Sequence, residues 1–346
     1  MAVQGIYIYG IVPNRTTSKV TTRLLNESGI YTISYLHTSA IVSDSERKSV
    51  NQSDKESLGR LLVHHQRMIE NLKWKGFNIL IPVKLGTIVK SKEEVLKILA
   101  NGHVLINEIL KKIENLTEID LAVVWATFPV LLNEIALDPD IIAMKDEMQK
   151  RSNAPLQNDQ LKLGRLMQTK IIQKNKDIEL KILDELSPFC IDTKTHEVMN
   201  DEMITNAAFL IDKHKTAEFE QVIDRLDEEF DGLLKFKLIG PLPCYSFYTI
   251  EVKELNPEQV VQAKKELELN EKTSELEIKR AYLEKARIFH PDTQVENGEE
   301  SFNKINKAYH ILIDYSAAVR QSSKTKRISL SKEKVTENLV LVKIKD

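Results

Sequence analysis

The sequence predicts an α+β protein with an N-terminal α+β domain, a second, ferredoxin-like α+β domain and a small C-terminal helical module. Segments rich in β-branched and aromatic residues alternate with amphipathic helical segments, which predicts mixed structure. From residue 119 the order is strand, long helix, two strands, helix and strand, the split βαβ order of ferredoxin-like domains. The length of 346 residues fits two or three domains. We place the parts at residues 1–118, 119–253 (with a long helical insertion) and 254–320, followed by a basic tail at 321–346.

The N-terminal part begins with a strand at Val3–Val12, which is apolar on both faces and is therefore expected to be buried on both. Ser91, followed three residues later by Glu94, predicts a capping box that begins a helix reaching about Ile113. The other elements predicted in this part are a strand region at Ile30–Val42, a helix at Asp54–Leu72 and a strand at Phe77–Leu85.

The second part contains the long helical insertion. After a strand at Ile119–Trp125, residues Phe128–Leu186 have a mostly helical pattern, interrupted by a turn signal at Ser152–Pro155. The remaining predicted elements are strand-like segments near Pro188–Thr193 and Ala207–Asp212, a helix at Thr216–Phe230, and strands at Leu233–Ile239 and Ser246–Val252.

The third part is helical, with a first helix predicted from about Glu258 to Leu267 and a second over Glu275–Phe289. Pro291 ends the second helix because it has no backbone N–H and restricts the residue before it. The tail contains seven Lys or Arg residues and three acidic residues, so it is basic. We expect the strand-like segment Leu339–Ile344 to dock on the body and the rest of the tail to be mobile.

The composition excludes several classes of protein. A hydrophobic content of 42% and a charged content of 29% are those of a globular protein. The net charge of -2 argues against a nucleic-acid binder, and no run approaches the roughly 18 apolar residues of a membrane span. The N-terminus lacks the basic region of a secretory signal. Two distant cysteines, Cys190 and Cys244, fit reduced thiols in a cytoplasmic protein.

The tripeptide His290-Pro291-Asp292 lies between two amphipathic helical patterns, residues 278–289 (IKRAYLEKARIF) and 302–312 (FNKINKAYHIL). In this setting, residues 257–320 resemble a J-domain, the module by which DnaJ-type proteins engage a DnaK-type chaperone. The resemblance implies that this loop and the basic face of the preceding helix bind the chaperone. The basic residues that we assign to this site are Arg280 and Arg287, which share the face opposite the apolar stripe, and Lys279 beside that face.

Two features weaken the basic face. Residues 275–289 contain four basic and three acidic side chains, so the net charge of this helix is small. Glu284 is also placed to pair with Arg280 or Arg287 at helical spacing. The alternative is therefore a retained J-like fold that has lost its affinity for the chaperone.

Four landmarks earlier in the chain occur together: residues 5–10 (GIYIYG), 61–70 (LLVHHQRMIE), 81–87 (IPVKLGT) and 240–247 (GPLPCYSF). Their order and spacing resemble the GvpL/GvpF family of gas vesicle synthesis proteins over about residues 4–252. The resemblance implies a cytoplasmic protein, located at the gas vesicle or its assembly site. It also implies binding of the hydrophobic shell protein and contact with other gas vesicle accessory proteins. The motif residues that we single out as structural or shell-contacting are Gly86, Thr87, Gly240, Pro241, Pro243 and Tyr245.

No motif supports catalysis, a cofactor or a metal. The adjacent pair His64–His65 points about 100° apart on a helix and does not chelate, so a packed structural role is expected. The turn Gly86–Thr87 lacks the glycine-rich loop of a phosphate site, and no nucleophile elbow occurs.

The sequence thus predicts a gas vesicle assembly factor that binds the shell protein and recruits a DnaK-type chaperone through its J-like module. The first alternative is a minor shell or nucleation component whose J-like fold is inactive towards DnaK. An enzyme, acting on a nucleotide for example, ranks third because nothing in the residues supports it.

Overall fold

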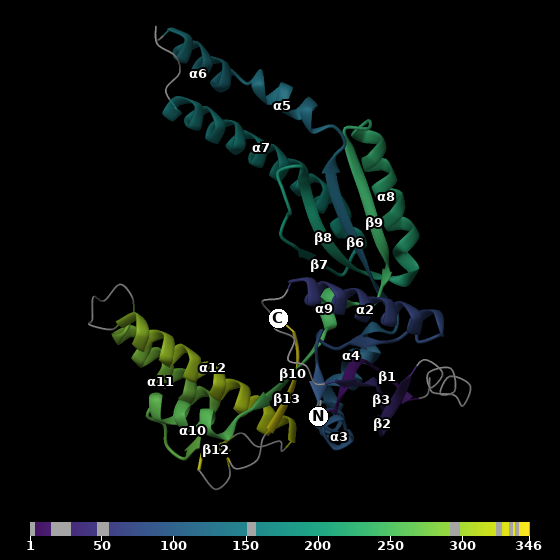
Figure 1. Ribbon diagram of the computed structural model, residues 1–346, viewed down its shortest axis with the longest axis vertical. Helices are drawn as coiled ribbons and strands as arrows, with labels where there is room; N and C mark the ends of the chain where they lie inside the picture. The colour runs from purple at the N-terminus through teal and green to yellow at the C-terminus, as the bar shows by residue number, and fades with distance from the viewer. Residues whose placement is uncertain are drawn as a thin grey trace. The chain divides into compact units, whose positions relative to one another are not determined.

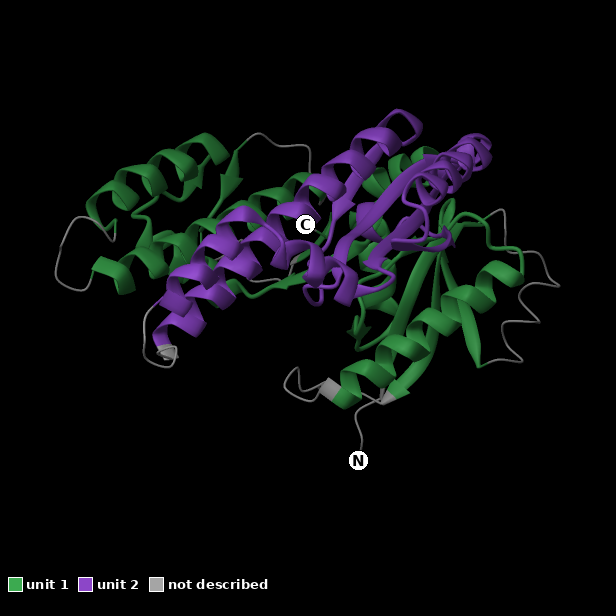
Figure 2. Ribbon diagram, turned by 90° about the horizontal axis from the view of Figure 1, so that it is seen from above, with its two compact units in different colours: residues 1–112, 248–346 green, residues 113–247 purple. Residues whose placement is uncertain are grey.

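The computed structural model describes residues 4–14, 29–46, 55–150, 157–290, 298–322, 327–331, 335 and 339–345. The chain forms two compact units, residues 1–112 with 248–346 and residues 113–247, coloured separately in Figure 2. Both units mix helices and strands, as the predicted fold class requires. No helix in the described part of the chain has the length and apolar content needed to cross a bilayer.

The N-terminal domain is built on a five-stranded sheet of order β2-β3-β1-β4, with β5 also paired to β1 and all pairs antiparallel. The central strand β1 is buried on both faces from Gly5 to Pro13, as predicted. The elements of this domain are β1 (Gln4–Pro13), β2 (Ile30–Tyr35), β3 (Thr38–Glu46), α2 (Lys55–Trp74), β4 (Ile81–Pro82), β5 (Ile88–Val89), α3 (Lys92–Asn101) and α4 (His103–Ile113); all except β4 and β5 are labelled in Figure 1.

Three predictions for this domain were wrong. The strand expected at Phe77–Leu85 is limited to the two residues of β4. The capping box at Ser91 does not form, because the carboxylate of Glu94 accepts a hydrogen bond from the backbone N–H of Lys90 (2.7 Å) and Ser91 makes no side-chain cap bond. The helix expected to reach Ile113 ends at Asn101, and α4 follows after Gly102.

The second unit has the ferredoxin-like arrangement. Its four-stranded antiparallel sheet has the order β7-β8-β6-β9, in which the first and third strands of the unit lie side by side at the centre. Figure 1 shows the elements, which are β6 (Leu116–Trp125), α5 (Phe128–Ala136), α6 (Pro139–Lys150), α7 (Gln157–Leu186), β7 (Asp192–Thr195), β8 (Met203–Asp212), α8 (Thr216–Glu229), β9 (Leu234–Leu242) and α9 (Tyr245–Tyr248).

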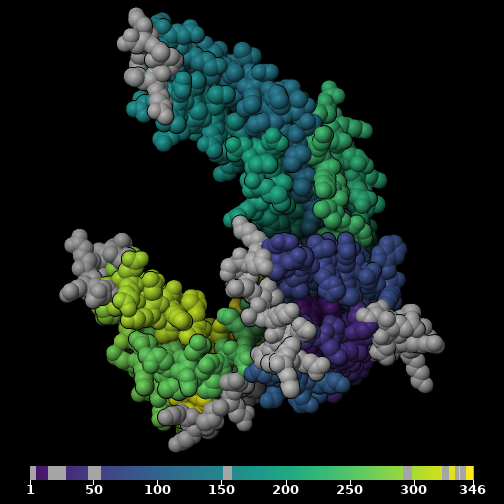
Figure 3. Space-filling model, viewed as in Figure 1, coloured from purple at the N-terminus to yellow at the C-terminus, as the bar shows by residue number. Residues whose placement is uncertain are grey.

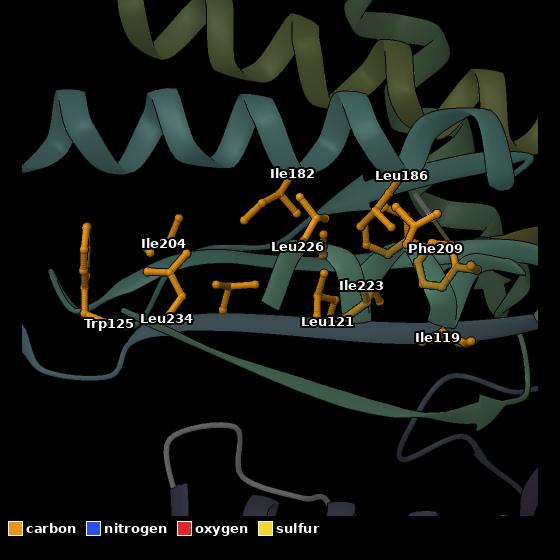
Figure 4. Packing of buried hydrophobic residues seen from close by; sticks show 14 of the residues in the cluster. Ile119, Leu121, Trp125, Ile182, Leu186, Ile204, Phe209, Ile223, Leu226 and Leu234 are labelled. Atoms are coloured by element: carbon orange, nitrogen blue, oxygen red, sulfur yellow. The ribbon is translucent and has the colours of Figure 1, made fainter. Parts of the chain in front are cut away.

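One face of this sheet carries the hydrophobic core of the unit. Strand side chains such as Leu121 and Phe209 point towards α7 and α8, which contribute Ile182 and Leu226 (Figure 4). The apolar residues of β6 alternate from Ile119 to Trp125 and those of α8 recur at the period of a helix, so each of these two elements turns one apolar face to the core. Strand β8 is buried on both faces from Ala207 to Ile211. The predicted turn at Ser152–Pro155 lies outside the described residues.

The strand expected at Ser246–Val252 was assigned to the wrong domain. Residues Tyr245–Tyr248 form the short helix α9, and the strand that follows, β10 (Ile250–Leu255), pairs with β13 (Leu339–Ile344) in the first unit. Figure 1 shows β13, in yellow, beside β10. The prediction that the last segment docks as a strand is therefore confirmed.

The helical module also belongs to the first unit. Its core joins Val260, Ile278, Ile305 and Leu312 with residues of the tail, among them Ile328. The prediction of a mobile tail is wrong for residues 327–331 and 335, whose apolar side chains are buried in this core. The elements are α10 (Pro257–Glu266), β11 (Lys272–Thr273), α11 (Glu275–Ile288), α12 (Gly298–Ser322) and β12 (Ile328–Ser329), with β11 and β12 paired. Figure 3 shows this module in green to yellow.

Candidate functional site

The candidate site is the solvent-facing side of α11. The helix begins at a complete capping box, in which the side chain of Glu277 accepts from the backbone N–H of Ser274 (2.6 Å) and the hydroxyl of Ser274 accepts from the N–H of Glu277. Because both bonds satisfy N–H groups that would otherwise lack partners, the start of the helix is fixed. The carboxylate of Glu277 also accepts from the hydroxyl of Ser274 (2.8 Å). The bonds from this hydroxyl and from the backbone N–H of Ser274, with the charge of Arg327 adding to them, lower the pKa of the Glu277 carboxyl.

The inner side of α11 packs against α12. Ile278 is fully buried between the helices, and the ring of Tyr282 stacks on that of Tyr309 with centroids 4.3 Å apart. Aromatic stacking adds about 0.5–1.5 kcal/mol to the burial of the rings. This packing sets the rotation of α11 about its axis and so determines which residues face solvent.

The outer side carries a stripe that we call the α11 stripe: Leu276, Lys279, Arg280, Leu283 and Arg287. Spacings of three and four residues place these side chains on one face, and all five are exposed. The exposed fractions of the two leucines, 80% and 45%, are high for this residue type. The structure therefore brings together the three predicted basic residues and adds two apolar ones.

The α11 stripe is partly neutralised. The guanidinium of Arg280 donates to the carboxylate of Glu284 at 3.0 Å, which decides between the two partners that the sequence left open. Lys285, one position off the stripe, pairs with Glu268 at 2.7 Å. Both pairs are solvent-exposed on at least one side and contribute little to stability.

His290 lies just beyond the end of α11 and is exposed. Its imidazole meets the ring of Phe302 edge-on, with centroids 5.8 Å apart and planes at 77°. The other two members of the predicted loop, Pro291 and Asp292, lie outside the described residues.

The landmark Gly86–Thr87 forms a tight turn in the N-terminal domain. Gly86 has a φ of +82°, which favours glycine, and its N–H donates to the hydroxyl of Tyr7 (3.2 Å). That hydroxyl also lies 2.8 Å from Nδ1 of His65 on α2. Burial, with the nearby His64 adding to it, lowers the pKa of His65 to about 4, so the ring is neutral near pH 7. His65 thus has the packed structural role that was predicted for the pair, whereas His64 is exposed and its Nε2 lies 3.3 Å from the hydroxyl of Tyr9.

The landmark Gly240–Tyr245 lies beside a buried carboxylate. A side chain on Gly240 would come within 3.2 Å of the backbone oxygen of Glu118, so the close approach favours glycine. The carboxylate of Glu118, 1% exposed, accepts hydrogen bonds from the backbone N–H (2.8 Å) and hydroxyl (2.9 Å) of Ser246. Burial raises the pKa of Glu118, with the charge of Asp120 adding to it and the bonds from Ser246 opposing it.

The remaining landmark residues serve the backbone of the same segment. Pro241 follows Gly240 in a cis peptide bond, and the carbonyl oxygen of Pro243 accepts from the N–H of Tyr245 (2.7 Å). Sequence reasoning identified these residues but missed Glu118 and Ser246. Acidic residues at positions 118 and 120, within a strand that is otherwise largely apolar, were the available signal.

Within the described residues, no group of three or more His, Cys, Asp or Glu side chains is arranged to hold a metal ion. The geometry supplies an exposed stripe of basic and apolar side chains on α11 and two buried polar clusters that hold turns.

Comparison with protein families matches residues 5–249 to the family described as gas vesicle synthesis protein GvpL/GvpF, and residues 265–319 to the DnaJ domain. Gas vesicle protein F of Nostoc sp. is 24% identical over 247 residues, covering 71% of this chain and 98% of that protein. Chaperone protein DnaJ 1 of Aquifex aeolicus is 45% identical over 49 residues, 14% of each chain.

Two solved structures are similar in fold. The crystal structure of GvpF from Anabaena sp. PCC7120 matches with a TM-score of 0.58 and 22% identity, covering 70% of this chain and 97% of that one. The crystal structure of GvpF from Microcystis aeruginosa matches with a TM-score of 0.55 and 22% identity, covering 70% and 98%.

Proposed function

Because this chain belongs to the gas vesicle synthesis protein GvpL/GvpF family and carries a DnaJ domain, we propose that it is a cytoplasmic assembly factor that brings a DnaK-type chaperone to the gas vesicle shell protein. The family body binds the shell protein, and α11 recruits the chaperone. The observation that supports chaperone recruitment is the α11 stripe, which is exposed on a helix whose position is fixed by its N-terminal cap and by its packing.

The chemistry of the α11 stripe fits an acidic surface that includes an apolar patch. Lys279, Arg280 and Arg287 supply cationic donors, and Leu276 and Leu283 lie among them with exposed methyl groups. Charges at an exposed interface mainly accelerate association and are screened by salt, whereas buried leucines slow dissociation. We therefore expect recruitment that weakens with salt.

The proposed binding of the shell protein is supported by exposed apolar side chains in the N-terminal domain. On α2, which carries one of the family landmarks, Leu62 and Val63 are about half exposed (51% and 49%), and Trp74 is 88% exposed. Large exposed apolar side chains favour contact with an apolar partner. Attachment of the DnaJ domain to the same chain raises the local concentration of chaperone at that partner.

The test measures the ATPase rate of DnaK with the full-length chain. We expect the wild-type chain to stimulate hydrolysis and His290→Gln to abolish the stimulation. A double Arg280→Ala, Arg287→Ala variant should weaken it, most strongly at low salt, because long-range attraction is then largest. Lys307→Ala, on the exposed side of α12 in the same module, is the matched control and should behave as wild type.

Failure of the wild-type chain to stimulate DnaK would remove the recruitment half of the proposal. A pull-down with the major shell protein, using chains with and without residues 257–346, tests the other half separately. Binding lost on removal of these residues, with the body still folded, would contradict the assignment of shell binding to the body.

A second candidate is a minor shell or nucleation component whose J-like fold is inactive towards DnaK. The observation that favours it is the pairing of Arg280 with Glu284, which reduces the charge offered by the α11 stripe. In that case vesicles form in a His290→Gln strain and fail to form when the body is deleted.

A further inference from the structure

The last strand of the chain, β13, contacts both parts of the first unit. It pairs along its whole length with β10, from Ile250 opposite Ile344 to Leu255 opposite Leu339. Side chains on a strand point alternately to its two faces, so a short apolar strand between two layers is buried on both. Leu341 belongs to the core of the helical module, whereas its neighbour Val342, also buried, lies against Gly102 between α3 and α4.

The outer edge of β13 has partners from both sides. The amide of Asn101, at the end of α3, donates to the carbonyl oxygen of Val340 (3.1 Å). The side chain of Gln321, at the end of α12, donates to the carbonyl oxygen of Val342 and accepts from its N–H (3.1 Å). Edge strands otherwise present unpaired backbone groups, and here α3 and α12 each satisfy some of them.

The approach of β13 to the N-terminal domain is close. At Gly102 a β-carbon would lie 2.8 Å from Cγ1 of Val342, which real contacts essentially never show. The φ of Gly102 is -81°, an angle open to any residue, so the nearness of Val342 on the strand, and of Cδ1 of Ile106 at 2.9 Å, favours glycine here rather than backbone freedom.

The partner strand β10 makes its own contacts with the two parts. The N–H of Lys84, beside the landmark turn, donates to the carbonyl oxygen of Ile250 (2.8 Å), and its ammonium pairs with Glu251. On the other side, the ammonium of Lys253 pairs with Asp314 of α12 at 2.6 Å. The β10–β13 ribbon is therefore bonded to the N-terminal domain at one side and to the helical module at the other.

We propose that β13 is a clip that holds the DnaJ domain in one position against the N-terminal domain, so that α11 is a fixed part of the body instead of a module on a flexible linker. If the proposed recruitment holds, a bound chaperone then acts at one defined place relative to α2. The clip itself needs no chaperone, and its test is independent of the ATPase assay.

The test measures the distance between nitroxide labels at Lys97 of α3 and Lys307 of α12, both exposed, by pulsed electron paramagnetic resonance on the full-length chain. A genetically encoded reactive residue at each position leaves Cys190 and Cys244 unchanged. We expect one narrow distance peak for the intact chain. A chain that ends at Asn338, and so lacks the clip, should give a broad distribution.

A point variant tests the clip without removing the strand. Gly102→Leu places a side chain where Val342 lies and should broaden the peak. Gly59→Leu is the matched control: it lies on α2 of the same domain with no atom within 4 Å of an added β-carbon, and should leave the peak narrow. A broad distribution for the intact chain, or a narrow one for Gly102→Leu, would overturn the proposal.

Discussion

Removing the hydroxyl of Ser246 should destabilise the second unit by an amount that depends on pH. Ser246 supplies two of the hydrogen bonds to the buried carboxylate of Glu118. The variant Ser246→Ala deletes the one from its hydroxyl, together with the 3.4 Å contact of this hydroxyl with Nε2 of the exposed His196, and keeps the one from its backbone N–H. Because burial raises the pKa of Glu118, its carboxyl is neutral at mildly acidic pH and ionised only at alkaline pH.

The two charge states give different magnitudes. A hydrogen bond to a charged group contributes about 1.5–3 kcal/mol, and one between neutral groups about 0.5–1.5 kcal/mol. We therefore expect Ser246→Ala to lower the free energy of unfolding by about 2 kcal/mol at about pH 9 and by about 1 kcal/mol at about pH 5. With a urea dependence of about 2 kcal/mol per M, the alkaline loss lowers the midpoint by about 1 M.

The wild-type protein has its own pH dependence, with a sign fixed by the same pKa. In the unfolded chain the Glu118 carboxyl ionises near 4.5, whereas in the folded unit it ionises at a higher pH. The folded state binds the proton more tightly, so this group favours folding at low pH. Its contribution falls as the pH rises from 4.5 through the raised pKa.

Trp125 provides the assay. It is buried in the second unit, and its indole N–H donates to Asn175 at 2.8 Å, so its fluorescence reports on the unfolding of this unit. The chain contains only one other tryptophan, the exposed Trp74, which Trp74→Phe removes from the signal. Ser187→Ala, which deletes a hydrogen bond to a backbone oxygen at an exposed site of the same unit, is the control and should lose less than about 0.5 kcal/mol. If Ser246→Ala lowers the free energy of unfolding by the same amount at both pH values, the reasoning that Glu118 is neutral at acidic pH and ionised at alkaline pH is refuted.

Three further outcomes are expected. Because the pKa of His65 is lowered to about 4, the first unit should lose thermal stability as the pH falls from 6.5 towards 4, and calorimetry of His65→Gln should show a flatter pH profile; an unchanged slope contradicts the burial of a neutral ring. Gly10→Ala should lower the free energy of unfolding of the N-terminal domain by about 1–3 kcal/mol, since the new β-carbon would lie 2.9 Å from the backbone oxygen of Ile81. Gly59→Ala, with open space around it, is the control and should not destabilise the domain in the same unfolding experiment. Phe219→Ala should cost about 3–5 kcal/mol in the fluorescence assay because the ring is fully buried, and a loss below about 1 kcal/mol would show that the site collapses around the cavity.

Local patterns predicted most of the elements. The helices at 55–74, 216–229 and 257–266 lie within two or three residues of their predicted ranges, because each has a complete apolar stripe at helical period. The ferredoxin-like order followed from the succession of elements alone. The GvpL/GvpF and DnaJ resemblances, found from a few landmarks, are confirmed over residues 5–249 and 265–319.

Long-range choices could not be predicted in this way. Strand β10 was assigned to the nearer sheet, yet its partner β13 begins more than 80 residues later, and the local apolar pattern does not show which strand a segment pairs with. The hydrogen bonds between Glu118 and Ser246 join residues separated by 128 positions. The capping box at Ser91 does not form for a local reason: the carboxylate of Glu94 accepts from the N–H of Lys90 instead of that of Ser91. Which N–H it accepts from depends on side-chain rotamers that the sequence does not determine.

The two halves of the chain use their polar groups in opposite ways, and this decides how variants should be interpreted. In the family body, Tyr7, His65 and Glu118 are buried, and each has a partner that holds a landmark turn, so substitutions there act first on stability. On α11, Lys279 and Arg287 are exposed, so we expect substitutions there to change stability little and to act on the proposed chaperone binding. A variant of Gly86 or Gly240 that abolishes vesicle formation therefore does not by itself identify a shell contact, because the loss of a turn has the same result. A variant of the α11 stripe that leaves unfolding unchanged and abolishes chaperone stimulation does identify a binding surface.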